Sequence, residues 1–242
     1  MIYIVYLLGI NKGGIIMKKV LSIIFTVAIC LTLFSGCGDT SSSNDAKKSA
    51  SGEAGEKVQV QSFEDVEYEP GTRTDTEYSN SILGFKFDCG YEYTMTSDED
   101  LDKMMDAGID IAYEDSEEGK RVKDFAEITT VYEMMAMDDI TNGSVLIMAE
   151  KVQSQEITED QYISVLKTQL ENTELKYDYK DISETELCGV VYTNLTYDVT
   201  ADGSSYKQTM LIKRVGDRMV VISFTYFDES DFDDMLESFS KI

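Results

Sequence analysis

Residues 131–149 read VYEMMAMDDITNGSVLIMA and carry the strongest structural signal in the chain. Val131 to Met137 and Val145 to Ala149 are apolar at nearly every position rather than at alternate ones. Strands of this kind are covered on both faces, so the two segments are predicted to be central strands of a sheet. Asn142-Gly143 between them favours positive φ angles, which predicts a hairpin.

Segments further along the chain show the alternation of half-buried strands, with apolar residues at every second position. One such segment has its apolar residues at Val220, Ile222, Phe224 and Tyr226. Another has them at Val191, Leu195, Tyr197 and Val199. Asp202-Gly203 is predicted to turn the chain between the latter segment and Tyr206, so short turns join successive strands.

Three helices are predicted around these strands. The first begins at Ser97-Asp98-Glu99-Asp100, with Gly108 as its stop, and the second begins at the capping box Thr158-Glu159-Asp160-Gln161. The third has its apolar residues at helical spacing, at Phe232, Met235, Leu236 and Phe239. Strand runs with helices at the start, middle and end predict an α+β fold. We expect a single domain, residues 77–242, whose central antiparallel sheet has helices packed on both faces.

The amino terminus has the layout of an export signal. Met17, Lys18 and Lys19 precede an apolar stretch from Val20 to Phe34. A positive region followed by a short apolar region is typical of a signal peptide, whereas a spanning helix needs about 20 apolar residues. Residues 1–36 are therefore predicted to be a signal peptide, and Met17 is a better start than Met1.

Leu33-Phe34-Ser35-Gly36-Cys37 resembles a bacterial lipobox. The resemblance implies that Cys37 receives a diacylglyceryl group on sulfur and becomes the first residue after cleavage. Two acyl chains hold a protein stably at a bilayer, whereas one does not. Residues 37–76 are predicted to be the lipidated Cys and a flexible tether, because residues 38–62 are rich in Ser, Gly, Ala and Lys and have almost no apolar residue before Val58.

The start of the predicted domain is similar to a known family. Residues 78–87 read YSNSILGFKF and lead into Gly90-Tyr91-Glu92-Tyr93 and then an acidic helix, which is similar to the opening of PsbP-like domains. Cys89 and Tyr91 or Tyr93 stand where that family usually has Pro and Trp. The resemblance implies an α/β/α sandwich over residues 77–242, as in small lipoproteins of Gram-positive bacteria, and a non-catalytic accessory role.

Composition excludes several classes of function. The chain of 242 residues contains no His, which excludes His-dependent hydrolase triads and His-ligated zinc. Its 46 Asp and Glu against 21 Lys and Arg give a net charge of −25. Because nucleic-acid affinity depends on clustered Lys and Arg, no nucleic-acid partner is expected.

Two cysteines, Cys89 and Cys188, fall inside the predicted domain. An even pair outside the cytoplasm permits a disulfide, but nothing in the sequence places their Cα atoms within about 7 Å. Two buried free thiols and a reactive Cys are the alternatives. No catalytic residue, metal ligand or cofactor is expected.

These features predict a lipid-anchored protein on the outer face of the cytoplasmic membrane, at the cell surface. It would be a non-catalytic binding or accessory module for a protein, peptide or cell-wall component. One alternative is an extracytoplasmic hydrolase that uses carboxylates only, which requires a deep pocket where two or more acids with raised pKa converge. A purely structural surface protein is the other alternative.

Overall fold

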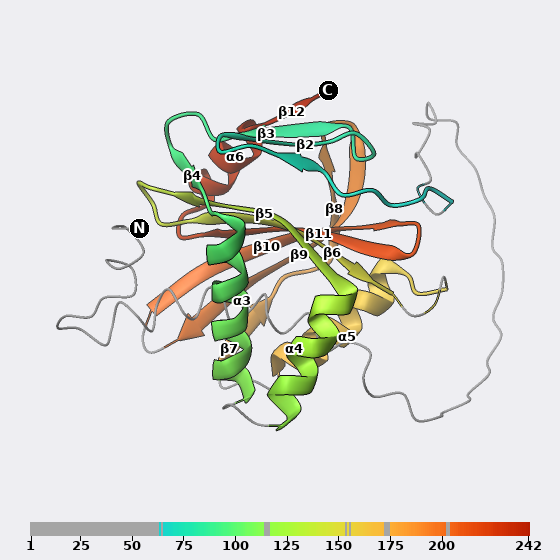
Figure 1. Cartoon of the computed structure of the whole chain (residues 1–242). Helices are drawn as coiled ribbons and strands as arrows, with labels where there is room; N and C mark the ends of the chain where they lie inside the picture. Colours follow the sequence, from blue (N-terminus) through green and yellow to red (C-terminus); the bar gives the residue numbers. More distant parts are fainter. Residues whose placement is uncertain are drawn as a thin grey trace, which may run out of the picture.

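The structure is a computed structural model that describes residues 63, 65–113, 117–152, 154, 156–171, 175–201 and 204–242. The described residues form an α+β fold with two antiparallel sheets, one of eight strands and one of four. Figure 1 shows three layers, with helices on one side of the larger sheet and the smaller sheet on the other. The predicted signal peptide, Cys37 and the tether up to residue 62 lie outside the described residues.

The larger sheet has the strand order β4-β5-β6-β11-β10-β9-β7, and β8 pairs with β9. Its strands are β4 (Tyr93–Met95), β5 (Thr130–Asp138), β6 (Ser144–Lys151), β7 (Lys176–Tyr179), β8 (Ser183–Leu187), β9 (Val190–Ala201), β10 (Ser204–Val215) and β11 (Arg218–Tyr226). Every pairing between them is antiparallel. The central antiparallel sheet predicted from the sequence is therefore confirmed.

The predicted central hairpin is confirmed as β5 and β6. Asn142 has a φ of 62°, which is the positive angle that the turn requires. The register of the pair shifts between Tyr132 and Met134, so a β-bulge lies at Glu133. Both faces of β6 are buried, as expected for a strand with apolar residues at consecutive positions.

Three helices cover one face of the larger sheet: α3 (Asp98–Tyr113), α4 (Glu117–Thr129) and α5 (Glu159–Glu171). Helix α5 confirms the predicted capping box, because Thr158 Oγ1 accepts the Gln161 N–H and Gln161 Oε1 accepts the Thr158 N–H. Helix α3 continues through Gly108, where the sequence predicted a stop, since one internal Gly costs a helix only about 1 kcal/mol. Helix α4 was not predicted.

Helices were predicted on both faces of the larger sheet, but its other face is covered mainly by the small sheet. The small sheet has the strand order β1-β2-β3-β12, with β1 (Thr72–Arg73), β2 (Glu77–Asn80), β3 (Phe85–Asp88) and β12 (Phe239–Lys241). Of the described helices, the short α6 (Glu229–Glu237) alone accompanies it on this face (Figure 1). Phe85, Phe87 and Phe239 pack ring against ring, at centroid distances of 5.1 to 5.2 Å for the pairs with Phe239. This aromatic cluster attaches the small sheet to the core.

The folded body begins before the predicted boundary at residue 77. Phe63 is 2% exposed and packs in the core between the two sheets, and its carbonyl accepts the Gly216 N–H at 2.9 Å. Val66 and Tyr68 pack against the same core. Phe63, Val66 and Tyr68, which fall inside the predicted tether of residues 37–76, are thus part of the folded body.

Gly216 lets this amino-terminal segment pass over the turn between β10 and β11. Its φ is +57°, and a Cβ added there would lie 2.3 Å from the Val66 carbonyl oxygen. We expect Gly216→Ala to destabilise the fold by about 2 kcal/mol or more, because a left-handed φ and a backbone clash add together. Urea unfolding measures the loss, and limited proteolysis near Val66 should become faster.

Gly84→Ala is the matched control for this substitution. Gly84 has a φ of +71°, but an added Cβ would have no described atom within 4 Å. It should therefore cost only the conformational penalty of about 1 to 2 kcal/mol. Equal losses for the two variants would show that the Val66 contact contributes nothing.

Among the described helices, none has the length and apolar character needed to cross a bilayer.

Candidate functional site

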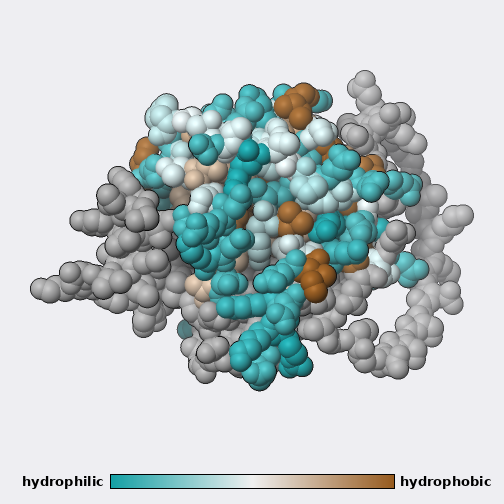
Figure 2. All heavy atoms as spheres, viewed as in Figure 1, coloured by the Kyte–Doolittle hydropathy of each residue, from teal (hydrophilic) through white to brown (hydrophobic). Residues whose placement is uncertain are grey.

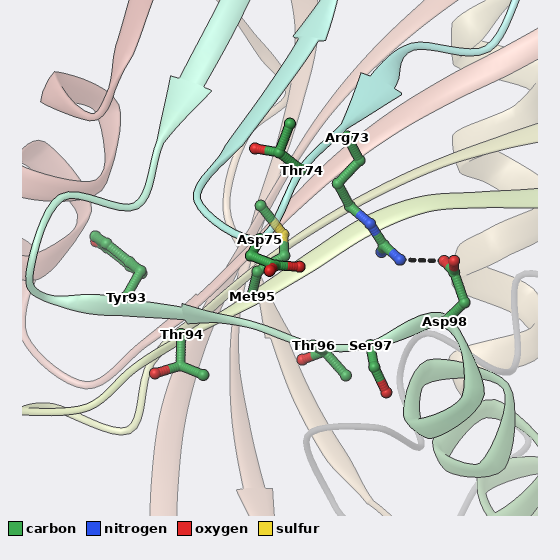
Figure 3. Close-up of a pocket in the computed structure, with 9 residues that line it drawn as sticks. All are labelled: Arg73, Thr74, Asp75, Tyr93, Thr94, Met95, Thr96, Ser97 and Asp98. Carbon is green, nitrogen blue, oxygen red and sulfur yellow. Dashed lines mark hydrogen bonds and ion pairs between the residues drawn. The ribbon is translucent and has the colours of Figure 1, made fainter.

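A cleft of about 450 Å³ opens between the two sheets at their β1 and β4 edges, and we call it the β4 cleft. The hairpin turn that follows β1 forms one side, and β4 with the start of α3 forms the other (Figure 3). It is lined by Arg73, Thr74, Asp75, Tyr93, Thr94, Met95, Thr96, Ser97 and Asp98. Most of these side chains are polar, and Tyr93 and Met95 supply the largest apolar surfaces.

The Thr74 hydroxyl fixes the turn on the first side of the cleft. Its Oγ1 accepts the N–H groups of Thr76 and Glu77, at 3.3 and 3.0 Å, and donates to the Glu77 carbonyl at 3.2 Å. Such local bonds are how Thr stabilises turns. The exposed Asp75 is thereby held at a defined place in the lining of the cleft, to which Met95 also belongs (Figure 3).

Strand β4 is the last strand of the larger sheet, so one of its edges is unpaired within the described sheet. Two backbone hydrogen bonds flank the strand, from the Thr96 N–H to the Met135 carbonyl and from the Asp139 N–H to the Glu92 carbonyl, and they set the alternation of its ladder with β5. In an antiparallel pair every second residue turns its N–H and C=O away from the partner. Tyr93 and Met95 are those residues, and the Tyr93 N–H bonds the Cys89 carbonyl at 3.1 Å.

An ion pair between Arg73 and Asp98 joins the two sides at one end of the cleft (Figure 3). The Arg73 side chain is 15% exposed, whereas that of Asp98 is 84% exposed. Asp98 is the first residue of α3, where a carboxylate also interacts favourably with the helix dipole. Ser97 caps the same helix, because its Oγ accepts the Asp100 N–H at 3.2 Å.

The cleft has a negative electrostatic character. Arg73 is its one cationic lining residue among the described residues, against Asp75 and Asp98. Behind the cleft, Thr94 Oγ1 donates to the exposed Asp139 carboxylate at 2.7 Å. Burial, and then the nearby Asp138, raises the pKa of Tyr93 to about 12, so its hydroxyl stays protonated. A ligand that fits this site would be neutral or positively charged.

Glu133 forms a second polar group, between the sheets. Its carboxylate accepts the hydroxyls of Tyr68 and Tyr78, the latter at 2.6 Å, and the backbone N–H of Gly71 at 2.5 Å. Gly71 leaves room for the Tyr78 ring, since an added Cβ would lie 2.5 Å from it. Burial, and then the Glu133 charge, raises the pKa of both tyrosines. This network holds the amino-terminal segment to the bulge of β5.

Glu150 is a third polar group, on the helix face of the sheet. It is fully buried, and its Oε2 accepts the Tyr162 hydroxyl at 2.9 Å. Its Oε1 has no hydrogen-bond partner among the described residues. Burial raises the pKa of Glu150 to about 8, and the Tyr162 bond opposes the shift.

Glu133 and Glu150 do not form a catalytic pair. Glu133 bonds Tyr78 in the core under the small sheet, whereas Glu150 bonds Tyr162 of α5 on the opposite face. The carboxylate-only hydrolase requires acids that converge in one pocket, and these two do not.

The cysteines considered as sites are distributed over different parts of the chain. Cys37 lies outside the described residues. Cys89 and Cys188 are free thiols in the structure, Cys89 buried and Cys188 half-buried. Burial, and then Asp88, raises the pKa of Cys89 to about 11, and burial also raises that of Cys188. Both thiols are thus kept in their less reactive, protonated form.

Sequence reasoning missed the β4 cleft. Arg73 and Asp75 lie in the stretch assigned to the tether, and Ser97 and Asp98 were predicted only as the start of a helix. Strand β4 has only three residues, too few for an alternation to be recognised. The one usable signal was Pro70-Gly71, which marks a turn just ahead of the cleft residues.

No family model matches this chain, and no curated protein matches its sequence. Among solved structures, it is similar to the cyanobacterial PsbP (CyanoP) of Synechocystis sp. PCC 6803, with 11% identity and a TM-score of 0.40. That similarity covers 73% of this chain and 99% of the other. It is also similar to LpqN of Mycobacterium tuberculosis, which is involved in cell envelope biogenesis. There the identity is 9% and the TM-score 0.29, over 46% of this chain and 72% of the other.

Proposed function

We propose that this protein is a lipid-anchored accessory protein on the outer face of the cytoplasmic membrane, which binds a protein, peptide or cell-wall component without catalysing a reaction. The observation that carries the proposal is Cys37, placed directly after Ser35-Gly36 and the apolar stretch that ends at Phe34. A thiol is required for thioether attachment, and the small neighbours suit cleavage before it. No other residue in this stretch offers that combination.

The folded body supports a binding role through the β4 cleft. The cleft combines a strand edge that is unpaired within the described sheet, the apolar surfaces of Tyr93 and Met95, and charged residues at its sides. The surface around it is mostly hydrophilic: Figure 2 shows polar residues over α3 and α4, and hydrophobic residues in small separate patches. A partner would therefore be recognised at a limited site and not through a broad apolar face.

Cys37→Ser is the test of anchoring. We expect the wild-type chain in the membrane fraction, with an amino-terminal peptide that begins at Cys37 and carries the mass of a diacylglyceryl group. The Cys37→Ser chain should lack that mass, keep residues before position 37 and lose incorporation of labelled palmitate. Mass spectrometry of the terminal peptide and membrane fractionation measure both effects.

Cys30→Ser is the matched control, because Cys30 lies in the apolar stretch ahead of the lipobox. It should leave lipid attachment unchanged. A wild-type chain that retains residues 30–36, or that carries no lipid on Cys37, would contradict the anchoring proposal.

A further inference from the structure

The unpaired edge of β4 offers three backbone groups to a ligand. The ladder alternation turns the Met95 N–H, the Met95 C=O and the Tyr93 C=O away from β5. The same side of β4 borders the β4 cleft, so these groups lie along an open space and not under a neighbouring described strand. An extended chain that enters the cleft can satisfy them as an added strand.

We propose that the β4 cleft binds an extended peptide segment of a partner protein, which adds to β4 as a new edge strand and carries apolar residues flanked by Lys or Arg. This inference rests on the proposed binding role and names the partner class of that site. Strand addition gives affinity through main-chain hydrogen bonds and selectivity through alternate side chains.

The geometry sets the pattern of the peptide. A residue opposite Met95 would exchange two hydrogen bonds with it, and the residue two positions on would donate its N–H to the Tyr93 carbonyl. Residues directly opposite each other point to the same face of a sheet. Since Tyr93 and Met95 pack towards the core between the sheets, these two peptide side chains enter the cleft and should be apolar.

Charge complementarity selects basic residues at the flanks. Asp75 lies over the cleft, and Asp139 lies beside Thr94 on the other face of β4. A second copy of this chain is a poorer occupant, because it would bring the same acidic rim against itself.

A synthetic peptide tests the proposal with the purified full chain in detergent. The probe is fluorescein-labelled Lys-Arg-Val-Thr-Val-Thr-Val-Arg-Lys, and fluorescence anisotropy measures its binding. Two comparison peptides carry Glu in place of every Lys and Arg, or N-methyl groups on the valines. We expect saturable binding of the probe and at least tenfold weaker binding of both comparison peptides.

Two substitutions locate the site. Met95→Pro removes the N–H on the unpaired edge and leaves the bonds to β5, since Pro is tolerated at strand edges. Asp75→Lys reverses a charge on an exposed turn and should not disturb folding. Each substitution should weaken binding of the probe at least tenfold. The control Glu184→Lys makes the same charge change at an exposed site on β8, far along the larger sheet from β4, and should leave the affinity within twofold.

Hydrogen exchange distinguishes strand addition at β4 from general charge attraction, which would not protect one particular amide. The bound probe should slow exchange of the Met95 amide at least tenfold and leave the amides of β7 unchanged. Equal binding of the N-methylated peptide, or an equal loss in Glu184→Lys, would overturn the inference. So would protection of another strand in place of Met95.

Two further outcomes would replace the occupant and thereby overturn the inference. One is self-association of the chain that Met95→Pro abolishes and that the probe does not inhibit. In that case a second copy would occupy the edge of β4. The other is probe binding only after deletion of residues 38–62, since the chain would then fill its own cleft. Suppose instead that the membrane-held chain captures a partner equally well with and without Asp75→Lys. That result would contradict this inference and leave the proposed binding role standing.

Discussion

Replacing Glu133 by Ala is expected to destabilise the protein by at least about 3 kcal/mol. The carboxylate accepts three hydrogen bonds, from Tyr68, Tyr78 and the backbone of Gly71. Each buried donor left without a partner costs about 1 to 3 kcal/mol. Because two of the three donors belong to the segment before β2, this segment should also detach from β5. Urea unfolding of the full chain, followed by circular dichroism, measures the change.

Two milder variants separate the hydrogen bonds from the packing of the side chain. Glu133→Gln keeps one acceptor oxygen and the volume, so it should cost less than the Ala variant. Tyr78→Phe removes one donor and leaves the other two, and it should cost about 1 to 2 kcal/mol. An unfolding midpoint of Glu133→Ala equal to that of wild type would show that the network contributes nothing to stability.

Replacing Glu150 by Gln is expected to make the protein more stable at alkaline pH and nearly unchanged at pH 5. Burial raises the pKa of Glu150 from its ordinary value of 4.5 to about 8. Between these values the folded chain holds a proton that the unfolded chain releases, so stability falls as pH rises, by roughly 1.4 kcal/mol for each pH unit. Above about pH 8 both states are ionised and the loss is complete. Gln is neutral at every pH, so the Glu150→Gln variant does not lose this stability as the pH rises.

The measurement is the difference in unfolding free energy between Glu150→Gln and wild type, from pH 5 to pH 9. It should increase with pH and level off near pH 8. Glu156→Gln, at an exposed acid that precedes α5, is the control and should show a small difference without this trend. A constant difference across the range would mean that Glu150 titrates normally in the folded chain.

The sequence predicted the parts of the fold in which local pattern and tertiary environment agree. Central strands β5 and β6 have consecutive apolar residues because the core lies on both of their faces, and α5 has both a capping box and a helical stripe. The small sheet was not predicted, because its strands have two to four residues and β12 pairs with β3 from the far end of the chain. Pairing of such short segments depends on the core that they cover, and a local sequence pattern does not predict that core.

The β4 cleft was still harder to predict. Its chemistry depends on an edge of one sheet lying opposite an edge of another, and Arg73 meets Asp98 only through that arrangement. The sequence did predict correctly that Ser97 begins a helix. The sequence could not show that β4 is the last strand of the described sheet, because the position of a strand in a sheet depends on its neighbours in space.

The entry point of the chain into the folded body has a consequence for orientation. Phe63 enters beside Gly216, and Figure 1 shows that the described chain begins at the opposite end of the molecule from β4. The predicted tether from Cys37 would join the body at that end, on the side away from the β4 cleft. A partner bound at β4 would therefore not have to displace the attachment.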